Sequence, residues 1–288
     1  MMRVPYKVNL PTGERYTFIK NTLRNRTLYT VCEEAHCPNV GECWGNGTAT
    51  FMILGSNCSR GCRFCAVTHG KMLPLDKDEP QKVRDSIKLM KLDYVVITSV
   101  DRDDLPDKGA EAFANVITAL YGLKIKIEVL IPDFSGIPKF IDRIIAAKPD
   151  VIAHNIETVR RLTPDVRDPR ATYDQSLKVL SYIKKKSNII TKSSIMIGLG
   201  ETDDEVLETM RDLRNVGVNI LTVGQYLRPT KKQLEVVEYS SMERFKFFEE
   251  KGYEYGFDYV ASGPLVRTSY KAAEAYVKGE IEKGVKND

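Results

Sequence analysis

The chain has 288 residues, of which 42% are hydrophobic, enough for a sizeable core in one large α/β domain or two small ones. A net charge of +4 is too small to indicate a nucleic-acid-binding protein by itself, and no apolar run reaches the length of a membrane span. The first residues resemble neither a secretory signal nor a transit peptide, so we expect a cytoplasmic protein that binds neither nucleic acid nor membrane.

Strands and helices alternate along most of the chain. Residues 1–48 have few apolar runs and many turn-forming residues, and they predict an extended N-terminal arm. Short β-branched runs predict strands at 48–55, 93–99, 124–132, 150–157, 191–200 and 219–226. Helical patterns follow at 79–91, 108–121, 136–147, 173–186, 203–216 and 241–252, with a final helix near 270–283.

Strands that are separated by helices of this length pair in parallel, so the pattern predicts an α/β fold. Six βα units form either an open doubly wound sheet or most of a β/α barrel. We divide the chain into an arm (1–48), the βα region (49–255) and a C-terminal extension (256–288). Polar and glycine-rich residues follow several of the strands, and this is the edge where parallel α/β folds build their sites.

All six cysteines lie in two groups of three. The first group, C-x4-C-x5-C, is Cys32, Cys37 and Cys43. The second group, C-x3-C-x2-C, is Cys58, Cys62 and Cys65. A long chain of cytoplasmic character does not need disulfide staples, so metal ligation is the better interpretation. Neither spacing is the paired C-x2-C of zinc sites, although His36 or His69 could complete a zinc site as an alternative.

Iron–sulfur clusters are the other thiolate-bound cofactors, and a four-iron cluster needs one ligand for each iron. Three cysteines leave one iron open, and an open metal position can bind and activate a substrate. A triad therefore favours catalysis over electron storage. Gly61 would let the second group turn sharply around the cluster. Arg60 and Arg63 would place positive charge and N–H donors near it, and Phe64 would shield it.

The second triad, with an aromatic residue before its last cysteine and a strand before it, resembles the radical S-adenosylmethionine (SAM) superfamily. The resemblance implies a partial (β/α)6 barrel with an N-terminal arm and a C-terminal extension. It also implies a 4Fe-4S cluster, held by Cys58, Cys62 and Cys65, whose open iron is chelated by SAM. Biotin synthase, a rival in this superfamily, lacks an upstream triad, and tRNA methylthiotransferases add nucleic-acid-binding domains.

The upstream triad narrows the resemblance to the lipoyl synthase family. Several segments resemble the signature blocks of that family, among them "EEAHCPNVGECW", "VVITSVDRDDLPDKGA", "HNIETVRRL", "VGQYLRP" and "SGPLVRTSY". The implied activity is insertion of two sulfur atoms, at C6 and C8 of an octanoyl chain on a lysine of a lipoyl carrier protein. Two SAM molecules are split, and an auxiliary 4Fe-4S cluster supplies the sulfur. Cys32, Cys37 and Cys43 would hold this second cluster.

The family closes the auxiliary cluster with a serine of an Arg-Ser-Ser-Tyr motif. Here the motif runs Arg267-Thr268-Ser269-Tyr270, so we assign the fourth ligand to Ser269, with Thr268 as the weaker candidate. For SAM, the candidates at strand ends are Thr98, Ser99, Asn155, Glu157, Lys192, Gly198 and Gly200. Glu157 suits the two ribose hydroxyls, and the two glycines would allow close approach of the backbone to SAM.

The resemblance also implies partners. They are an octanoylated lipoyl carrier protein (the E2 lipoyl domain of a 2-oxoacid dehydrogenase or the glycine cleavage H protein), a ferredoxin or flavodoxin as electron donor, and a cluster carrier protein. We expect a monomer. A non-catalytic redox carrier with two clusters is the rival of a different class, and it would need four protein ligands for each cluster.

Overall fold

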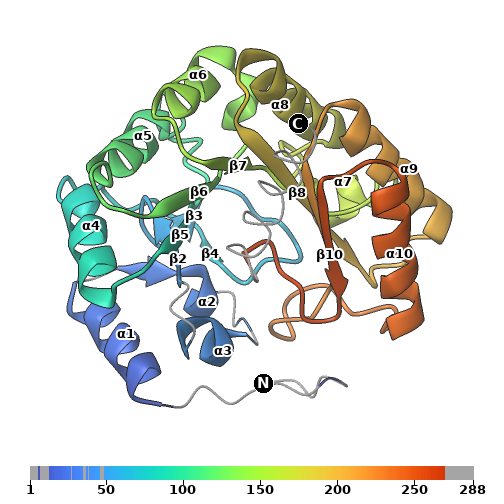
Figure 1. Ribbon diagram of the computed structural model, residues 1–288, viewed down its shortest axis with the longest axis horizontal. Coiled ribbons are helices and arrows are strands. Elements are labelled where there is room, and N and C mark those ends of the chain that lie inside the picture. The colour runs from blue at the N-terminus through green and yellow to red at the C-terminus, as the bar shows by residue number, and fades with distance from the viewer. Residues whose placement is uncertain are drawn as a thin grey trace, which may run out of the picture. The chain divides into compact units, whose positions relative to one another are not determined.

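The computed structural model describes residue 6 and residues 13–26, 28–34, 37, 39–45 and 49–269. The chain divides into two compact units, whose elements are labelled in Figure 1. The N-terminal unit comprises Lys7–Gly61 and Cys65–Asp150, and the C-terminal unit comprises Met1–Tyr6, Cys62–Phe64 and Val151–Asp288. The helix predicted near 270–283 lies outside the described residues.

The N-terminal unit is built on a sheet with the order β1 (Tyr29–Thr30), β2 (Ala49–Ile53), β5 (Tyr94–Ser99) and β6 (Lys126–Leu130). β2 pairs in parallel with β5, and β5 with β6, whereas β1 is antiparallel to β2. β2 is buried along its whole length, as its uninterrupted apolar run predicts for a strand of a parallel sheet. The helices α4 (Glu79–Met90), α5 (Ala110–Ala119) and α6 (Pro138–Ala146) pack in succession beside this sheet (Figure 1).

The described part of the arm is mostly helical, with the short strand β1 between α1 and α2, so the predicted extended conformation is wrong for these helices. It forms α1 (Glu14–Asn25), α2 (Val31–Glu34) and α3 (Val40–Gly45). Ile19 and Leu23, four residues apart on one face of α1, are fully buried. Tyr16 of α1 stacks on the buried Trp44 of α3, with ring centroids 5.0 Å apart. The arm therefore has a small core of its own.

The rest of the N-terminal unit carries short elements between the main strands. β3 (Asn57–Cys58) pairs in parallel with β4 (Thr68–His69), and η1 (Phe134–Gly136) follows β6. Asp133 caps η1 by accepting the backbone N–H of Ser135 at 2.8 Å. β3 and β4 flank the second cysteine group in sequence.

The C-terminal unit contains a second run of parallel strands in the order β7 (Val151–Ala153), β8 (Ile190–Ile197), β9 (Ile220–Gln225) and β10 (Tyr259–Gly263). Its helices are α7 (Thr163–Val166), α8 (Tyr173–Lys186), α9 (Asp203–Asn215) and α10 (Met242–Glu254). Apolar residues of α8, α9 and α10 pack with those of β8 and β9 in one core. A capping box starts α9, since Thr202 accepts the N–H of Glu205 while Glu205 accepts that of Thr202.

The predicted α/β class is confirmed, and every predicted strand has a counterpart. β10 was not predicted: it falls in the segment that we assigned to the C-terminal extension, and it pairs in parallel with β9 through Val260 and Leu221. The sheet therefore continues beyond residue 255. No helix among the described residues is both long and apolar enough to cross a membrane.

Candidate functional site

Cys58 ends β3 and sits among backbone N–H donors. Its Sγ accepts hydrogen bonds from the backbone of Arg60 at 3.5 Å and of Asp101 at 3.4 Å. As a thiol it donates to Asp101 Oδ2, 3.8 Å away. N–H groups that point at a sulfur favour the thiolate and tune bound iron–sulfur clusters. The surroundings of Cys58 thus fit a cluster ligand.

Cys62 belongs to the C-terminal unit and is placed in a similar way. Its Sγ accepts the backbone N–H of Asp168 at 3.3 Å. The neighbouring Arg63 is held by the segment around α7, because its backbone N–H bonds to the Val166 carbonyl and its guanidinium to the Asp165 carbonyl. Each of these two thiols therefore has a backbone N–H donor.

Cys65 is half-buried in the N-terminal unit. The joining of Cys58, Cys62 and Cys65 around one cluster stays a prediction. Among the described residues, no three His, Cys, Asp or Glu side chains converge as they would around a single metal ion. Cluster cysteines each bind a different iron and stand further apart. The described residues thus give no support to a zinc site completed by His69, and His36 lies outside them.

The upstream triad comes together in the N-terminal unit. Cys32 lies in α2, Cys43 lies in α3, and Cys37 lies between the two helices. Burial, together with a negative charge on Cys37, raises the pKa of Cys32 to about 12. Burial likewise raises the pKa of Cys43 to about 12, with added repulsion from Cys32 and Cys37. Three thiols that oppose each other's ionisation suit a cationic group that would turn them into thiolate ligands.

Trp44 and Thr50 also border this triad. The Trp44 side chain is fully buried, and both the Trp44 indole and the Thr50 backbone act to lower the pKa of Cys32, against the larger effect of burial. The indole N–H makes no full hydrogen bond among the described residues. A donor of this kind beside a buried sulfur fits a site for an anionic iron–sulfur cluster.

The two candidates for the fourth ligand differ in their contacts. Thr268 Oγ1 accepts a hydrogen bond from Asn155 Nδ2 at 2.9 Å, so a side chain of the same unit engages this hydroxyl. Ser269 follows in the turn after β10 and is half-buried. The contact to Thr268 therefore favours Ser269 as the ligand, which is the predicted assignment. Closure of the auxiliary cluster by Ser269 stays a prediction.

Two of the predicted SAM contacts carry buried polar atoms that lack a hydrogen-bond partner among the described residues. These atoms are Ser99 Oγ, at the end of β5, and Asn155 Oδ1, just after β7. Buried polar atoms in folded proteins are almost always paired, so an orphaned atom indicates a missing ligand or water. Asn155 also donates to Glu157 Oε1 at 3.1 Å. Each of these two atoms thus fits contact with a polar small molecule such as SAM, and their contact with one and the same molecule stays a prediction.

Glu157 follows β7, and Lys192 of β8 pairs with the last residue of β7. Glu157 has a positive φ of 69°, an uncommon conformation for a residue with a side chain, and it bridges to β8 at Ile195. Burial raises the pKa of Glu157, while Arg167 and Asn155 act in the opposite direction. Lys192 is buried within β8. Strain at a buried carboxylate is typical of functional positions.

Of the remaining SAM candidates, Thr98 and Gly198 are closely contacted by the protein itself, whereas a side chain at Gly200 would have room. Thr98 Oγ1 donates to the Leu130 carbonyl at 2.9 Å, across the β5–β6 pair. A Cβ atom at Gly198 would lie 2.1 Å from Gln225 Nε2 and 2.5 Å from the Glu238 carbonyl oxygen. The absence of a side chain at Gly198 therefore lets these two residues of the protein approach its backbone closely. A Cβ at Gly200 would meet only Val237, at 3.8 Å. A role of these residues in SAM binding stays a prediction.

Sequence reasoning missed a group of aspartates around Arg60. Asp101 and Asp103 follow β5 and Asp133 follows β6, and all three lie within salt-bridge distance of the Arg60 guanidinium. The segment "DRDD" after a predicted strand was the available signal. Its acidic density beside an arginine-containing cysteine loop would have suggested ion pairing. The Arg60 guanidinium is thus paired with carboxylates, while its backbone N–H points at Cys58 Sγ, and the expected placement of its charge near a cluster stays a prediction.

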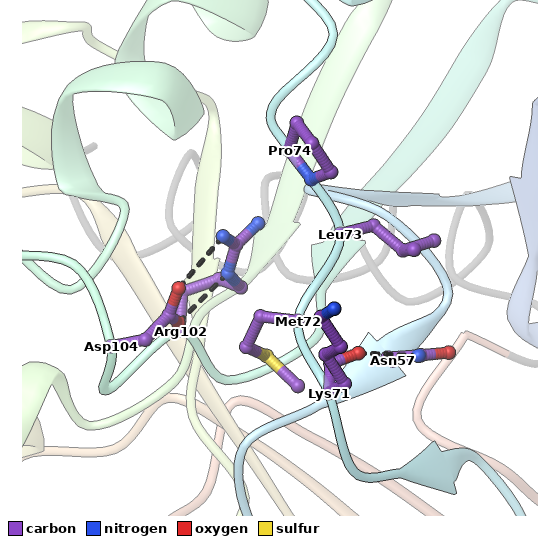
Figure 2. Close-up of a pocket in the computed structure, with 7 residues that line it drawn as sticks. All are labelled: Asn57, Lys71, Met72, Leu73, Pro74, Arg102 and Asp104. Carbon is purple, nitrogen blue, oxygen red and sulfur yellow. Dashed lines mark hydrogen bonds and ion pairs between the residues drawn. The ribbon is translucent and has the colours of Figure 1, made fainter.

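An open pocket of about 690 Å³ lies elsewhere in the N-terminal unit. It is lined by Asn57, Lys71, Met72, Leu73, Pro74, Arg102 and Asp104. Figure 2 shows Arg102 and Asp104 paired at one side of it, and Met72 and Leu73 supply apolar surface. None of the predicted site residues lines this pocket, so it is separate from the candidate SAM contacts.

Comparisons with known proteins agree with these features. The model of the radical SAM superfamily matches residues 52–213, and the model of the N-terminal domain of lipoyl synthase matches residues 2–37. A lipoyl synthase of Picrophilus torridus is 75% identical over 285 residues, which is 99% of this chain and 98% of the relative. One of Anaeromyxobacter dehalogenans is 56% identical, over 97% of this chain and 96% of the relative.

Solved structures at low identity show the fold. The match to a methylornithine synthase structure covers 81% of this chain and 81% of the methylornithine synthase chain, with a TM-score of 0.55 and 12% identity. The match to the hydrogenase maturase HydG of Carboxydothermus hydrogenoformans covers 80% of this chain and 56% of the HydG chain, with a TM-score of 0.61 and 16% identity. The near full-length matches and both family models lead to one conclusion: the chain belongs to the lipoyl synthase family of radical SAM enzymes.

Proposed function

We propose that the chain inserts two sulfur atoms, at C6 and C8 of an octanoyl group on a lysine of a lipoyl carrier protein. The observation that carries this is the 75% identity to a lipoyl synthase over nearly the whole of both chains. The gathering of Cys32, Cys37 and Cys43 in and between the arm helices α2 and α3 supports it independently, because electrostatic repulsion links all three thiols. A radical SAM enzyme with a single cluster would have no use for this upstream triad.

The cofactors follow from the thiol sites. Cys58, Cys62 and Cys65 would hold the cluster that binds SAM, and Cys32, Cys37 and Cys43 would hold the auxiliary cluster, with Ser269 as its fourth ligand. When bound, these groups would supply a radical able to take hydrogen from an unactivated carbon and the sulfur that replaces it. The backbone N–H groups directed at Cys58 and Cys62 would stabilise the thiolates.

The polar residues at the strand ends would hold and orient SAM. Ser99 Oγ and Asn155 Oδ1 would find in SAM the partners that they lack among the described residues. Glu157 would accept the hydroxyls of the ribose. The Asn155 to Thr268 hydrogen bond would link this binding site to the residue beside Ser269. Lys192, Thr98, Gly198 and Gly200 are the further candidates.

The proposed partners match this chemistry. The substrate is an octanoylated carrier protein, electrons come from a ferredoxin or flavodoxin, and a cluster carrier protein rebuilds the auxiliary cluster. The exposed or half-exposed Lys20, Arg24 and Arg26 of the arm could steer an acidic carrier domain. We propose that the protein works as a monomer in the cytoplasm.

The test is an anaerobic assay of the reconstituted protein with SAM, a reductant and an octanoyl-lysyl peptide. Mass spectrometry should show a product in which two sulfur atoms have each replaced a hydrogen. Cys58→Ala, which removes one ligand of the SAM cluster, should abolish the product while leaving the fold intact by circular dichroism. A wild-type protein with both clusters, confirmed by iron analysis, that leaves the peptide mass unchanged would refute the proposal.

A further inference from the structure

The loop Asp101–Asp104, which follows β5, makes repeated contacts with the first half of the second cysteine group. The backbone N–H of Ser59 bonds to the Asp101 carbonyl at 3.0 Å. Ser59 Oγ donates to Asp103 Oδ2 at 2.9 Å and accepts the backbone N–H of Asp103 at 3.0 Å. The backbone N–H of Asp101 points at Cys58 Sγ. Each residue from Cys58 to Arg60 is thus bonded to this loop.

Arg60 forms the strongest part of the contact. Its Nε and Nη2 donate to the two oxygens of Asp103, at 2.8 and 3.0 Å. Its Nη1 and Nη2 donate to the two oxygens of Asp133, at 2.7 and 2.8 Å. Paired donors facing paired acceptors fix the orientation of a guanidinium as well as its position. The arginine is therefore held on two sides at once.

This ion pair is buried. The exposed fractions of the side chains are 3% for Arg60, 13% for Asp103 and 0% for Asp133. Breaking such a pair leaves an unpaired charge in the interior, which is strongly unfavourable. The contact therefore resists opening, and Arg60 is anchored two residues away from Cys58 and from Cys62.

We propose that Asp103, Asp133 and Ser59 form a brace that fixes the Cys58–Arg60 segment and thereby positions Cys58 as a cluster ligand, with Arg60 as the anchored residue. The inference rests on the proposed function, since it assumes that the second triad holds a cluster. The carboxylates offset the charge of Arg60, so its role is to position the loop. Loops that carry ligands are usually more mobile than the elements they connect, and this brace restrains one.

Asp104 provides a matched control in the same loop. Its carboxylate pairs with Arg102, at 2.8 and 2.9 Å, and makes none of the contacts to Cys58–Arg60 described above. The test variants are Asp103→Asn, Asp133→Asn and Ser59→Ala, with Asp104→Asn as control. Arg60→Lys keeps the charge but cannot form paired bonds to two carboxylates. Ser59→Ala removes only a hydroxyl and keeps the test valid where a charge change prevents folding.

The experiment reconstitutes each full-length protein anaerobically with both clusters. It then follows iron loss to a chelator, and the electron paramagnetic resonance signal of the reduced protein before and after SAM is added. Asp103→Asn, Asp133→Asn and Arg60→Lys should lose the SAM-responsive signal and about half of the iron roughly 10- to 100-fold faster than wild type. The SAM-insensitive cluster should be retained. Ser59→Ala should show a smaller change in the same direction, and Asp104→Asn should behave as wild type.

The loss must be selective, because a general loss of stability would release both clusters together. Equal release of both clusters, or equal effects of Asp103→Asn and Asp104→Asn, would overturn the brace. So would full retention of the SAM-responsive signal in Asp103→Asn, Asp133→Asn and Arg60→Lys. A wild-type protein that binds no iron would instead refute the proposed function, so the two failures are distinguishable.

Discussion

Glu79, at the start of α4, is a buried carboxylate that holds the turn after β2. Both of its oxygens accept the backbone N–H of Leu54, at 3.2 and 2.9 Å. Leu54 has a positive φ of 69°, and Arg102 donates to its carbonyl at 3.0 Å. Glu79 and Arg102 thus fix an uncommon conformation of a branched residue, four positions before Cys58.

Stability should depend on pH through this residue. Burial raises the pKa of Glu79 from 4.5 to about 7, and the Leu54 N–H acts in the opposite direction. Since the folded state holds this proton more tightly than the unfolded chain, the stability contribution of Glu79 is fully present below pH 4.5 and is lost as pH rises through about 7. The difference in pKa corresponds to about 3 kcal/mol.

The measurement compares wild type with Glu79→Gln, which keeps a hydrogen-bond acceptor but cannot ionise. The free energy of unfolding is obtained from urea titrations at several values between pH 5 and pH 8. Relative to the variant, wild type should lose up to about 3 kcal/mol across this range. A difference between the two proteins that stays constant with pH would show that Glu79 titrates normally.

At the scale of elements, strands that carry a run of apolar or β-branched residues were predictable, and strands without such a run were not. β2 and β5 are nearly continuous apolar or β-branched runs, and both were found close to their predicted bounds. β10, "YVASG", is short and ends in small residues, so nothing distinguished it from a loop. α1 buries Ile19 and Leu23 within an otherwise polar sequence, and this narrow stripe is a weak helical signal.

The turn after β8 gives a test with a built-in control. Gly198 and Gly200 have nearly the same positive φ, 99° and 100°, so alanine is strained to a similar degree at both. Only at Gly198 would the new Cβ collide with neighbours, Gln225 and the Glu238 backbone. Gly198→Ala should therefore lower the free energy of unfolding by about 1–3 kcal/mol more than Gly200→Ala.

Chemical denaturation of the two single variants measures this difference. Equal losses of stability would mean that the Glu238 segment moves aside and that Gly198 is not required for packing. SAM binding, followed by calorimetry on folded protein, separates the two roles. A loss of SAM affinity in folded Gly200→Ala protein that exceeds the loss in Gly198→Ala would assign Gly200 to the SAM site.

At the scale of the whole molecule, the site roles of the cysteines were predictable from the sequence. The site roles of common polar residues such as Thr98 and Ser99 were only partly predictable. Thiolate triads have few other uses in such a chain, and the family comparison supports that interpretation. Thr98 and Ser99 are neighbours at one strand end, yet Thr98 bonds to a neighbouring strand, whereas the Ser99 hydroxyl has no hydrogen-bond partner in the described part of the chain. Strand register decides which hydroxyl hydrogen-bonds within the fold, and the residue types alone do not reveal the register.

The proposed carrier protein is folded and presents a protein surface, which a short peptide lacks. The basic residues of the arm helix α1 could attract such a surface if it is acidic. Arg24 has 65% of its side chain exposed, with Glu33 3.8 Å away, and Lys20 lies over the Tyr16 ring. Complementary surface charges speed encounter and act across roughly one Debye length, about 8–10 Å in physiological salt. This attraction should act on a folded acidic carrier protein and not on the short octanoyl-lysyl peptide.

The double charge reversal Lys20→Glu with Arg24→Glu should thus lower kcat/KM for an octanoylated carrier protein by about tenfold at low salt, with the deficit shrinking as salt rises. Turnover of the octanoyl-lysyl peptide should be unchanged. Lys185→Glu with Lys186→Glu, at the exposed end of α8, changes the net charge equally and serves as the control. Equal slowing by both pairs would reduce the effect to net charge, and equal slowing with peptide and carrier would place α1 in catalysis or folding.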